Sequence, residues 1–412
     1  MSRRMMSLNA FVMATGHHVA GWRHPAARAD GGLNFAHYQQ LARTAERGCF
    51  DALFLSDTLA MLPGSLEALS RMSRTEHFEP LTLLAGLAAV TERIGLVATV
   101  TTSYNQSEAV AQSFTSLEAL SGQRSGWNLV TSSNAQEAFN FGRDGHFEHA
   151  RRYELAHGFL TQVQQRWASA GVAPVQVLAG ASRAGCELAA AHADVVFTAQ
   201  PELAGAQRFY RELKALLPAF GRSAEQVKIM PGVMPIVANT PAEAQALFEQ
   251  LQALVQPEVG LSLLADIAGG TDLSAFPLDG PLPELPATES GVSRRDLLIR
   301  VAREQGLSIR QLYLRMAAAR GHLVLVGDAR QIADQLEQWF VDGAADGFNV
   351  MPPYLPGSLD AFVDLVVPEL QRRGLFRRAY QGRTLRDHLG LTRPETPRSN
   401  SFALQEALSA HG

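Results

Sequence analysis

Small polar side chains follow an apolar run in the segment RSGWNLVTSSNAQ, residues 124–136. Thr131, Ser132 and Ser133 come directly after WNLV, a run typical of a buried β-strand. Hydroxyl groups both donate and accept hydrogen bonds, so this cluster suits a polar ligand. A hydroxyl residue after a strand is also a common helix cap, and the pattern alone leaves both roles open.

Polar or imidazole side chains also follow the other strand-like runs of the chain. Each one alone is ordinary, but their repetition after successive strands favours a shared site. They are His17 and His18 after the first run, Asp57 after FLS, Thr101, Thr102, Ser103 and Tyr104 after ATV, and Ala181 with Ser182 after QVLAG.

The segment GASRAG, residues 180–185, places small residues and one hydroxyl at a predicted helix start. Backbone N–H groups and the helix dipole favour a phosphate at such a position. A capped structural helix explains the same residues. Ala184 stands where the nucleophile motif GxSxG needs its second glycine, and no matching Asp and His order supports a hydrolase.

The segment HFEHARRY, residues 146–153, contains two histidines three positions apart. A metal site is disfavoured, because no carboxylate set with zinc spacing and no HExxH motif accompanies them. His149 and Tyr153 are four positions apart and share a helical face. They could face a ligand or pack where the helix meets the barrel.

Strand-like and helical segments alternate along the chain, which predicts a parallel sheet with helical crossovers. About eight such units favour an α/β fold closed as a (β/α)8 TIM barrel, with the site at its C-terminal mouth. No GxGxxG or GxxxxGK[ST] motif supports an open sheet. HLVLV (322–326) and GFNVMPP (347–353) are both strand-like near the end, so one is expected to be accessory.

We expect one barrel domain over residues 1–390 and a C-terminal tail over 391–412. The Gly/Pro/Asp-rich stretch within 261–311 interrupts the alternation, and we interpret it as an insertion at the mouth that covers the site.

Composition excludes several classes of protein. A formal net charge of -4 and no basic block argue against nucleic-acid binding. No apolar run is long enough to span a membrane, and the N-terminal MSRRMMSLNAFVMATG is interpreted as a strand instead of a signal peptide. Two cysteines, Cys49 and Cys186, form no disulfide framework, which fits a cytoplasmic protein.

Several long segments resemble one known family. They are HFEPLTLLAGLAAVTERIGLVATVTTSYN (77–105), SGWNLVTSSNAQEAFNFG (125–142), HARRY (149–153), LAGASRAGCELAAAHADVVFTAQ (178–200) and DGFNVMPPYLPGSLDAFVDLVVPELQRRGLFR (346–377). In this order they resemble the bacterial-luciferase-like flavin monooxygenases, in the branch that contains nitrilotriacetate and dibenzothiophene sulfone monooxygenases. The likeness runs from the first strand to about Pro394. One departure is the short link ASAGVA between Trp167 and Pro174, where relatives commonly carry a long insertion.

The resemblance implies a barrel of the luciferase type that binds reduced FMN at its mouth. Its motifs imply a role for His17 in the reaction space and assign the remaining residues to the cofactor. Those implied for the flavin ring and its surroundings are Asp57, Thr102 and Asn128, and those implied for the phosphate end are Ser132, His149, Tyr153, Ala181 and Ser182.

The implied activity is a monooxygenase in which reduced FMN, supplied by a separate NAD(P)H:flavin reductase, reacts with O2 to a C4a-(hydro)peroxyflavin. Relatives of this type are homodimers or tetramers. The substrate is an unidentified small organic molecule, and the few basic residues near the predicted mouth favour a hydrophobic or sulfur-containing one. The alternatives are a hydride-transferring reductase or dehydrogenase with FMN or deazaflavin, a non-catalytic flavin-binding protein, and a metal-dependent barrel hydrolase.

Overall fold

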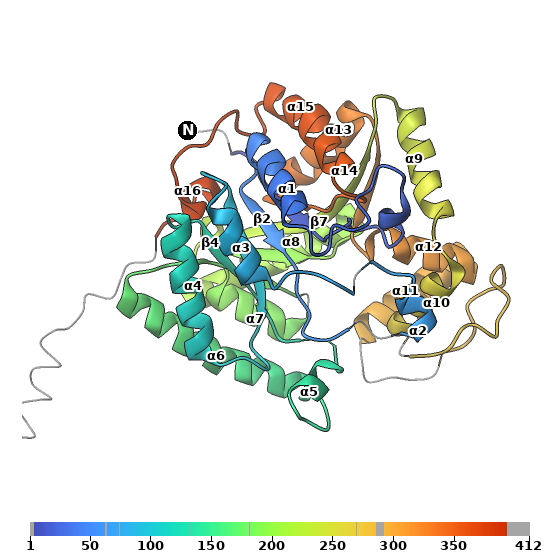
Figure 1. The fold of residues 1–412 in the computed structure, drawn as a ribbon, viewed down its shortest axis with the longest axis horizontal. Coiled ribbons are helices and arrows are strands. Elements are labelled where there is room, and N and C mark those ends of the chain that lie inside the picture. Colours follow the sequence, from blue (N-terminus) through green and yellow to red (C-terminus); the bar gives the residue numbers. More distant parts are fainter. Residues whose placement is uncertain are drawn as a thin grey trace, which may run out of the picture.

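The chain folds around a closed barrel of eight parallel strands in a computed structural model (Figure 1), which describes residues 4–61, 64–73, 75–132, 134–180, 182–268, 270–285 and 292–393. Neighbouring strands pair in the order β1, β2, β3, β4, β5, β6, β7 and β9, and β9 pairs back with β1. The predicted (β/α)8 barrel is therefore confirmed. The strands are β1 (Ser7–Val12), β2 (Ala52–Leu55), β3 (Gly95–Thr101), β4 (Ser125–Val130), β5 (Val175–Ala179), β6 (Val195–Thr198), β7 (Lys228–Val237), β8 (Leu323–Gly327) and β9 (Gly347–Val350).

Successive strand residues point to opposite faces, so each strand contributes to two apolar cores. On β4, Trp127 faces outward and packs against Phe114 and Trp167 of the surrounding helices. The inward faces contribute a second cluster that includes Phe11, Phe54 and many valines of β3, β5 and β6. Apolar burial on both faces explains why these strands are continuous hydrophobic runs.

Helices follow most of the strands and form the outer layer, as expected for this fold. They are α1 (Phe35–Arg47), α2 (Leu66–Leu69), α3 (Pro80–Ala88), α4 (Ser107–Ser121), α5 (Glu137–Asn140), α6 (His149–Ala170), α7 (Arg183–His192), α8 (Leu203–Leu216), α9 (Pro241–Ala253), α10 (Pro257–Ile267), α11 (Val292–Gln305), α12 (Ile309–Ala319), α13 (Ala329–Val341), α14 (Gly357–Ala361), α15 (Val367–Arg372) and α16 (Leu385–Leu389).

The ninth strand, β8, is the accessory one. The first half of β7 belongs to the barrel, where it pairs with β6 and β9 up to Val233. The second half, Val233 to Val237, runs on beyond the barrel and pairs with β8. HLVLV therefore pairs with the part of β7 that lies beyond the barrel, at the mouth. GFNVMPP supplies β9, the strand that closes the barrel.

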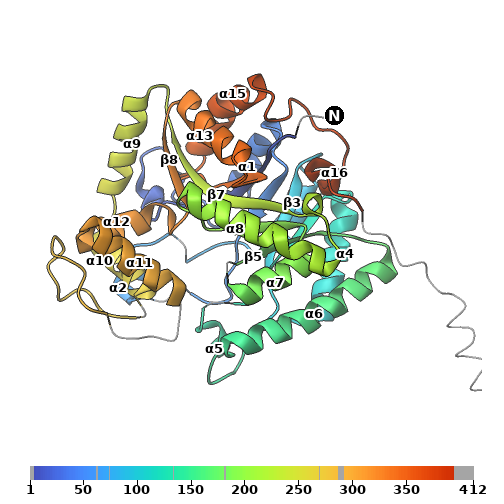
Figure 2. The same ribbon diagram turned by 180° about the vertical axis from the view of Figure 1, so that it is seen from behind.

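Among the described residues, the predicted insertion (261–311) contains α11 and is flanked by α10 and α12. These three helices gather with α2 at one end of the molecule, as both views show (Figures 1 and 2). A separate apolar cluster joins them to the segments after β1 and β2, through Val19, Ala20 and Met72. Because these segments follow strand ends, the insertion lies at the C-terminal mouth of the barrel.

The opposite end of the barrel is closed by the segment that contains α16. Leu385 and Leu389 belong to the cluster inside the barrel. A Cβ atom at Gly95 would lie 2.4 Å from Leu385 Cδ1, so the first residue of β3 has to be small. The link between α6 and β5 is short, because Gly171, with a φ of +66°, ends α6 four residues before β5 begins.

Candidate active site at the barrel mouth

Aromatic rings line the barrel interior near the carboxyl ends of β1, β2 and β6. The centroid of the Phe11 ring lies 4.6 Å from that of Phe54 and 5.2 Å from that of Phe197. His17, on the loop after β1, places its ring 4.6 Å from Phe11. Phe11, Phe54 and Phe197 therefore form an apolar floor of the mouth, and the polar groups of the loops lie above it.

His17 is fully buried in the structure. Its Nε2 lies 2.9 Å from the carbonyl oxygen of Phe11, and its Nδ1 lies 3.0 Å from Nη2 of Arg320. The expected position after the first strand is correct. The imidazole is held by two protein groups and is not exposed at the surface of the mouth.

Two residues of this region were not predicted. Arg320 ends α12 and His322 precedes β8, so neither follows a barrel strand. The His322 ring stacks on Phe197 with a centroid distance of 5.2 Å, and Gly232 on β7 leaves the space for it. The backbone is left-handed at Arg320 and Gly321, with φ of +49° and +88°. This turn allows the side chains of Arg320 and His322 to reach the mouth.

Asp57, after β2, is the predicted residue that the structure pairs most clearly with a charge. Its Oδ1 lies 3.1 Å from Nε2 of His77. The hydrogen bond to Asp57 raises the pKa of His77 above its usual value. The pair joins the loop after β2 to the segment before α3.

Ser132 lies in a buried chain of hydroxyl groups, with its own backbone in the left-handed region at a φ of +52°. Its hydroxyl donates to Oε2 of Glu137, so the hydroxyl of Thr101, 2.7 Å away, must be the donor toward Ser132. The other carboxylate oxygen of Glu137 accepts from Thr58 at 3.2 Å. Glu137, the first residue of α5, is buried and was not predicted, because a single glutamate after a polar segment gives no sequence signal.

Thr102 and Asn128 are both buried beside this chain. The Thr102 hydroxyl donates to the carbonyl oxygen of Val130 at 3.4 Å. The Asn128 amide nitrogen donates to Thr99 at 2.9 Å, and its Oδ1 is buried with no hydrogen-bond partner.

Tyr153 and Ser182 come together at the start of α7, at the end of the site to which the resemblance assigns both of them. Ser182 caps α7, because its Oγ accepts a hydrogen bond from the backbone N–H of Gly185 at 3.2 Å. The Tyr153 hydroxyl lies 3.2 Å from Ser182 Oγ, and the ring of His149 lies 5.0 Å from that of Tyr153. Ala181, also predicted here, lies outside the described residues.

Arg152 connects this cluster to Ser132. Its Nη1 donates to the carbonyl oxygen of Ser132, whereas its Nε is buried without a hydrogen-bond partner. Burial lowers the pKa of its guanidinium. The ion pairs of the described chain include none to Arg152, so a desolvated cation lies between the two predicted halves of the site.

A second unpredicted contact supports the wall near Ser132. The Tyr104 hydroxyl contacts Nδ1 of His146, and Nε2 of His146 donates to the carbonyl oxygen of Ser132 at 3.0 Å. Burial lowers the pKa of His146. His146 therefore holds the backbone of the loop. Among the described residues, no group of three or more His, Cys, Asp or Glu side chains is placed to hold a metal ion.

Comparisons with known proteins agree with this fold. Residues 11–347 match the family described as luciferase-like monooxygenase. The chain is 44% identical to nitrilotriacetate monooxygenase component A of Aminobacter aminovorans, over 96% of this chain and 98% of that protein. It is 42% identical to N-acetyl-S-(2-succino)cysteine monooxygenase of Bacillus subtilis (strain 168), over 95% and 98%.

Among solved structures, a riboflavin lyase, RcaE, with modified FMN and the substrate riboflavin is similar to this fold. Its TM-score is 0.81 at 25% identity, over 95% of this chain and 97% of that one. The chain therefore belongs to the luciferase-like monooxygenase family and is an enzyme of the monooxygenase class. In the described part of the chain, no helix is long and apolar enough to cross a membrane.

Proposed function

We propose that this protein is a monooxygenase that uses reduced FMN from a separate NAD(P)H:flavin reductase, and O2, to oxidise a small organic substrate. The observation that supports FMN best is the cluster of Tyr153, Ser182 and Arg152 at the mouth. It combines a helix N-terminus, two hydroxyl groups and a desolvated cation, which together suit a phosphate.

The phosphate end of the flavin is assigned to the start of α7. A Cβ atom at Gly185 would lie 3.3 Å from the Tyr153 hydroxyl. Because glycine has no side chain, the backbone at the start of α7 stays accessible beside this hydroxyl. The amides around Ser182, including Ala181 by the resemblance, and the Tyr153 hydroxyl are donors. His149 flanks the site, and Arg152 supplies positive charge.

The role of Ser132 is revised by its hydrogen bonds. Because its only proton is donated to the buried carboxylate of Glu137, it offers a ligand no donor. A carboxylate so close also disfavours a phosphate dianion. We therefore assign Ser132 to the flavin's sugar-alcohol chain, as an acceptor, and keep Asp57, Thr102 and Asn128 near the ring.

The flavin, when bound, supplies the reaction with O2, and the protein positions it and excludes water. The apolar floor of Phe11, Phe54 and Phe197 and the cover of α10 to α12 provide this exclusion. The neutral His17, buried beside Phe11, is placed to hold a proton at its Nε2 atom. We further propose a cytoplasmic homodimer or tetramer, on the resemblance alone.

An anaerobic titration with reduced FMN tests the phosphate assignment. Ser182→Asp retains a side chain that caps α7 but adds negative charge, so affinity should fall at least about tenfold. Ser169→Asp is the matched control, because Ser169 is exposed at the far end of α6 and should leave affinity unchanged. Unchanged affinity in Ser182→Asp would reject the assignment.

An oxygen electrode tests the reaction class. With a flavin reductase, NADH and FMN present, substrate oxidation should require O2. Product formation under strict anaerobic conditions would instead show hydride transfer and would reject a monooxygenase.

A further inference from the structure

We propose that Arg320, which the insertion carries to the mouth, is a positioning residue that fixes the orientation and the tautomer of His17. The proposal rests on the proposed function only for the importance of His17 in the reaction. The structural relation itself is a property of the protein without flavin.

The hydrogen bonds define which nitrogen of His17 carries the proton. A guanidinium can only donate, so Nδ1 of His17, 3.0 Å from Arg320 Nη2, must accept. The ring proton is therefore on Nε2, and it is donated to the Phe11 carbonyl oxygen at 2.9 Å. The ring is fully buried and has contacts on both sides, so its orientation is fixed.

The backbone at Arg320 indicates that its side chain is needed. It is the C-cap residue that follows α12 and has a left-handed φ of +49°, where glycine or asparagine is the usual choice. An arginine accepts this conformation at a cost, and here its guanidinium reaches both His17 and the Met13 sulfur at 3.4 Å. Loop and insertion are thereby joined at the residue closest to the reaction space.

The arrangement has a chemical consequence. A positive charge that donates to Nδ1 disfavours a second proton on the same ring, so His17 stays neutral with a single N–H. Among the described residues, the other titratable groups of this region include His322, whose ring stacks on Phe197, and His18, whose Nε2 contacts Gln252 at 3.1 Å. Movement of α12 away from the mouth would remove the Arg320 contact from Nδ1 of His17, so the position of α12 and the protonation of His17 are coupled.

Nuclear magnetic resonance of protein labelled with 15N-histidine, without flavin, tests this relation. The His17 signals are identified by their loss in His17→Gln. In the unmodified protein we expect one tautomer, protonated at Nε2, across the pH range in which the protein is folded. In Arg320→Asn, whose side chain tolerates the left-handed backbone but cannot reach the ring, we expect the pKa of His17 to rise by about one pH unit or more, so that the ring gains a second proton at the acidic end of this range.

Arg315→Asn is the matched control, because Arg315 is exposed on the same helix and contacts Gln305. It should leave the His17 signals unchanged. Arg320→Lys keeps the positive charge, so most of the rise in the His17 pKa seen in Arg320→Asn should be absent from it. Identical His17 titration in Arg320→Asn and the unmodified protein would overturn the proposal. Loss of FMN binding would affect only the proposed function, because these signals are measured without flavin.

Discussion

At the scale of single residues, the pair of Asp57 and His77 gives the mouth a pH-dependent contact. The pKa of His77 is raised by the Asp57 carboxylate, so the stabilisation is fully present below the pKa of an unfolded histidine. It is lost as the pH rises through the higher folded pKa. In Asp57→Asn, the pKa of His77 should fall toward about 6.5, as followed by proton NMR titration.

His24 is the matched control for this titration. Burial lowers its pKa, and its ring stacks on Tyr354 away from Asp57, so its titration should be the same in both proteins. A His77 titration that does not change in Asp57→Asn would contradict the pairing.

The sequence pattern indicates polar residues that follow barrel strands, such as Ser182. The common place of Ser182 and Tyr153 was implied by the family resemblance and not by the helical pattern, and the structure brings the two hydroxyl groups together. Arg320 and His322 could not be found in this way, since they precede an accessory strand. The only signal is the sequence Arg-Gly-His, in which Gly321 marks a turn.

At the scale of elements, the alternation of apolar runs and helical periodicity was sufficient to predict the barrel. Helix α7 begins at Arg183, within the helix start predicted from GASRAG, because Ser182 caps it. The choice between HLVLV and GFNVMPP as the closing strand could not be made from sequence. It depends on how far β7 runs past Val233, which is set by tertiary pairing.

The insertion owes its position to a small apolar cluster, so its packing can be tested separately from the barrel. Leu312 on α12 is fully buried in this cluster with Met72 and Val259. In Leu312→Ala we expect the free energy of local unfolding of this cluster to fall by about 2–5 kcal/mol. Hydrogen exchange of α12 amides, measured by mass spectrometry, should accelerate at least about tenfold.

Residues of β3 and β4 supply the internal reference for that experiment, because they lie at the other side of the barrel and should exchange at unchanged rates. Arg315→Ala, an exposed change on the same helix, should leave α12 protected. Equal acceleration throughout the chain would show that the insertion and the barrel unfold as one unit, contrary to this expectation.

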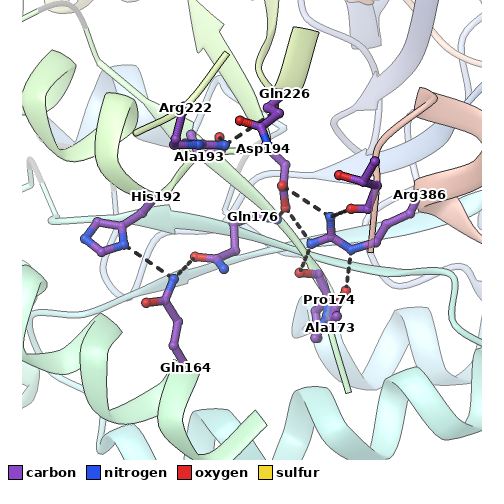
Figure 3. A network of polar contacts seen from close by, with 11 residues as sticks. Gln164, Ala173, Pro174, Gln176, His192, Ala193, Asp194, Arg222, Gln226 and Arg386 are labelled. Atoms are coloured by element: carbon purple, nitrogen blue, oxygen red, sulfur yellow. Dashed lines mark hydrogen bonds and ion pairs between the residues drawn. The ribbon is translucent and has the colours of Figure 1, made fainter. Parts of the chain in front are cut away.

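At the scale of the whole molecule, each end of the barrel carries a segment outside the alternation of strands and helices. Helices α10 to α12 lie at the mouth, and the segment around α16 closes the other end. Arg386 anchors this segment beneath β5 and β6, with Nη2 2.8 Å from Asp194 Oδ2 and Nε 2.9 Å from the Ala173 carbonyl oxygen (Figure 3). Gln176 and Asp194 are also joined, through the backbone N–H of Gln176 at 2.9 Å.

This anchor should be a main determinant of global stability. Arg386 and Asp194 are both largely buried, so removal of one partner leaves an uncompensated charge inside the protein. Arg386→Met should therefore lower the free energy of unfolding by about 3–5 kcal/mol, measured by urea denaturation. Arg393→Met, an exposed change in the same segment, should alter it by less than about 0.5 kcal/mol.

The double variant Arg386→Met with Asp194→Asn separates the charge from the packing. Without a carboxylate at position 194, the methionine leaves no buried charge unpaired, so the double variant should lose less stability than the sum of the two single variants. Strictly additive losses would show that Arg386 acts through its hydrogen bonds to the Ala173 and Thr392 carbonyl oxygens and not through Asp194. In either case, Arg386 would be shown to stabilise the segment that, together with Leu385 and Leu389, closes the barrel at the end opposite the site.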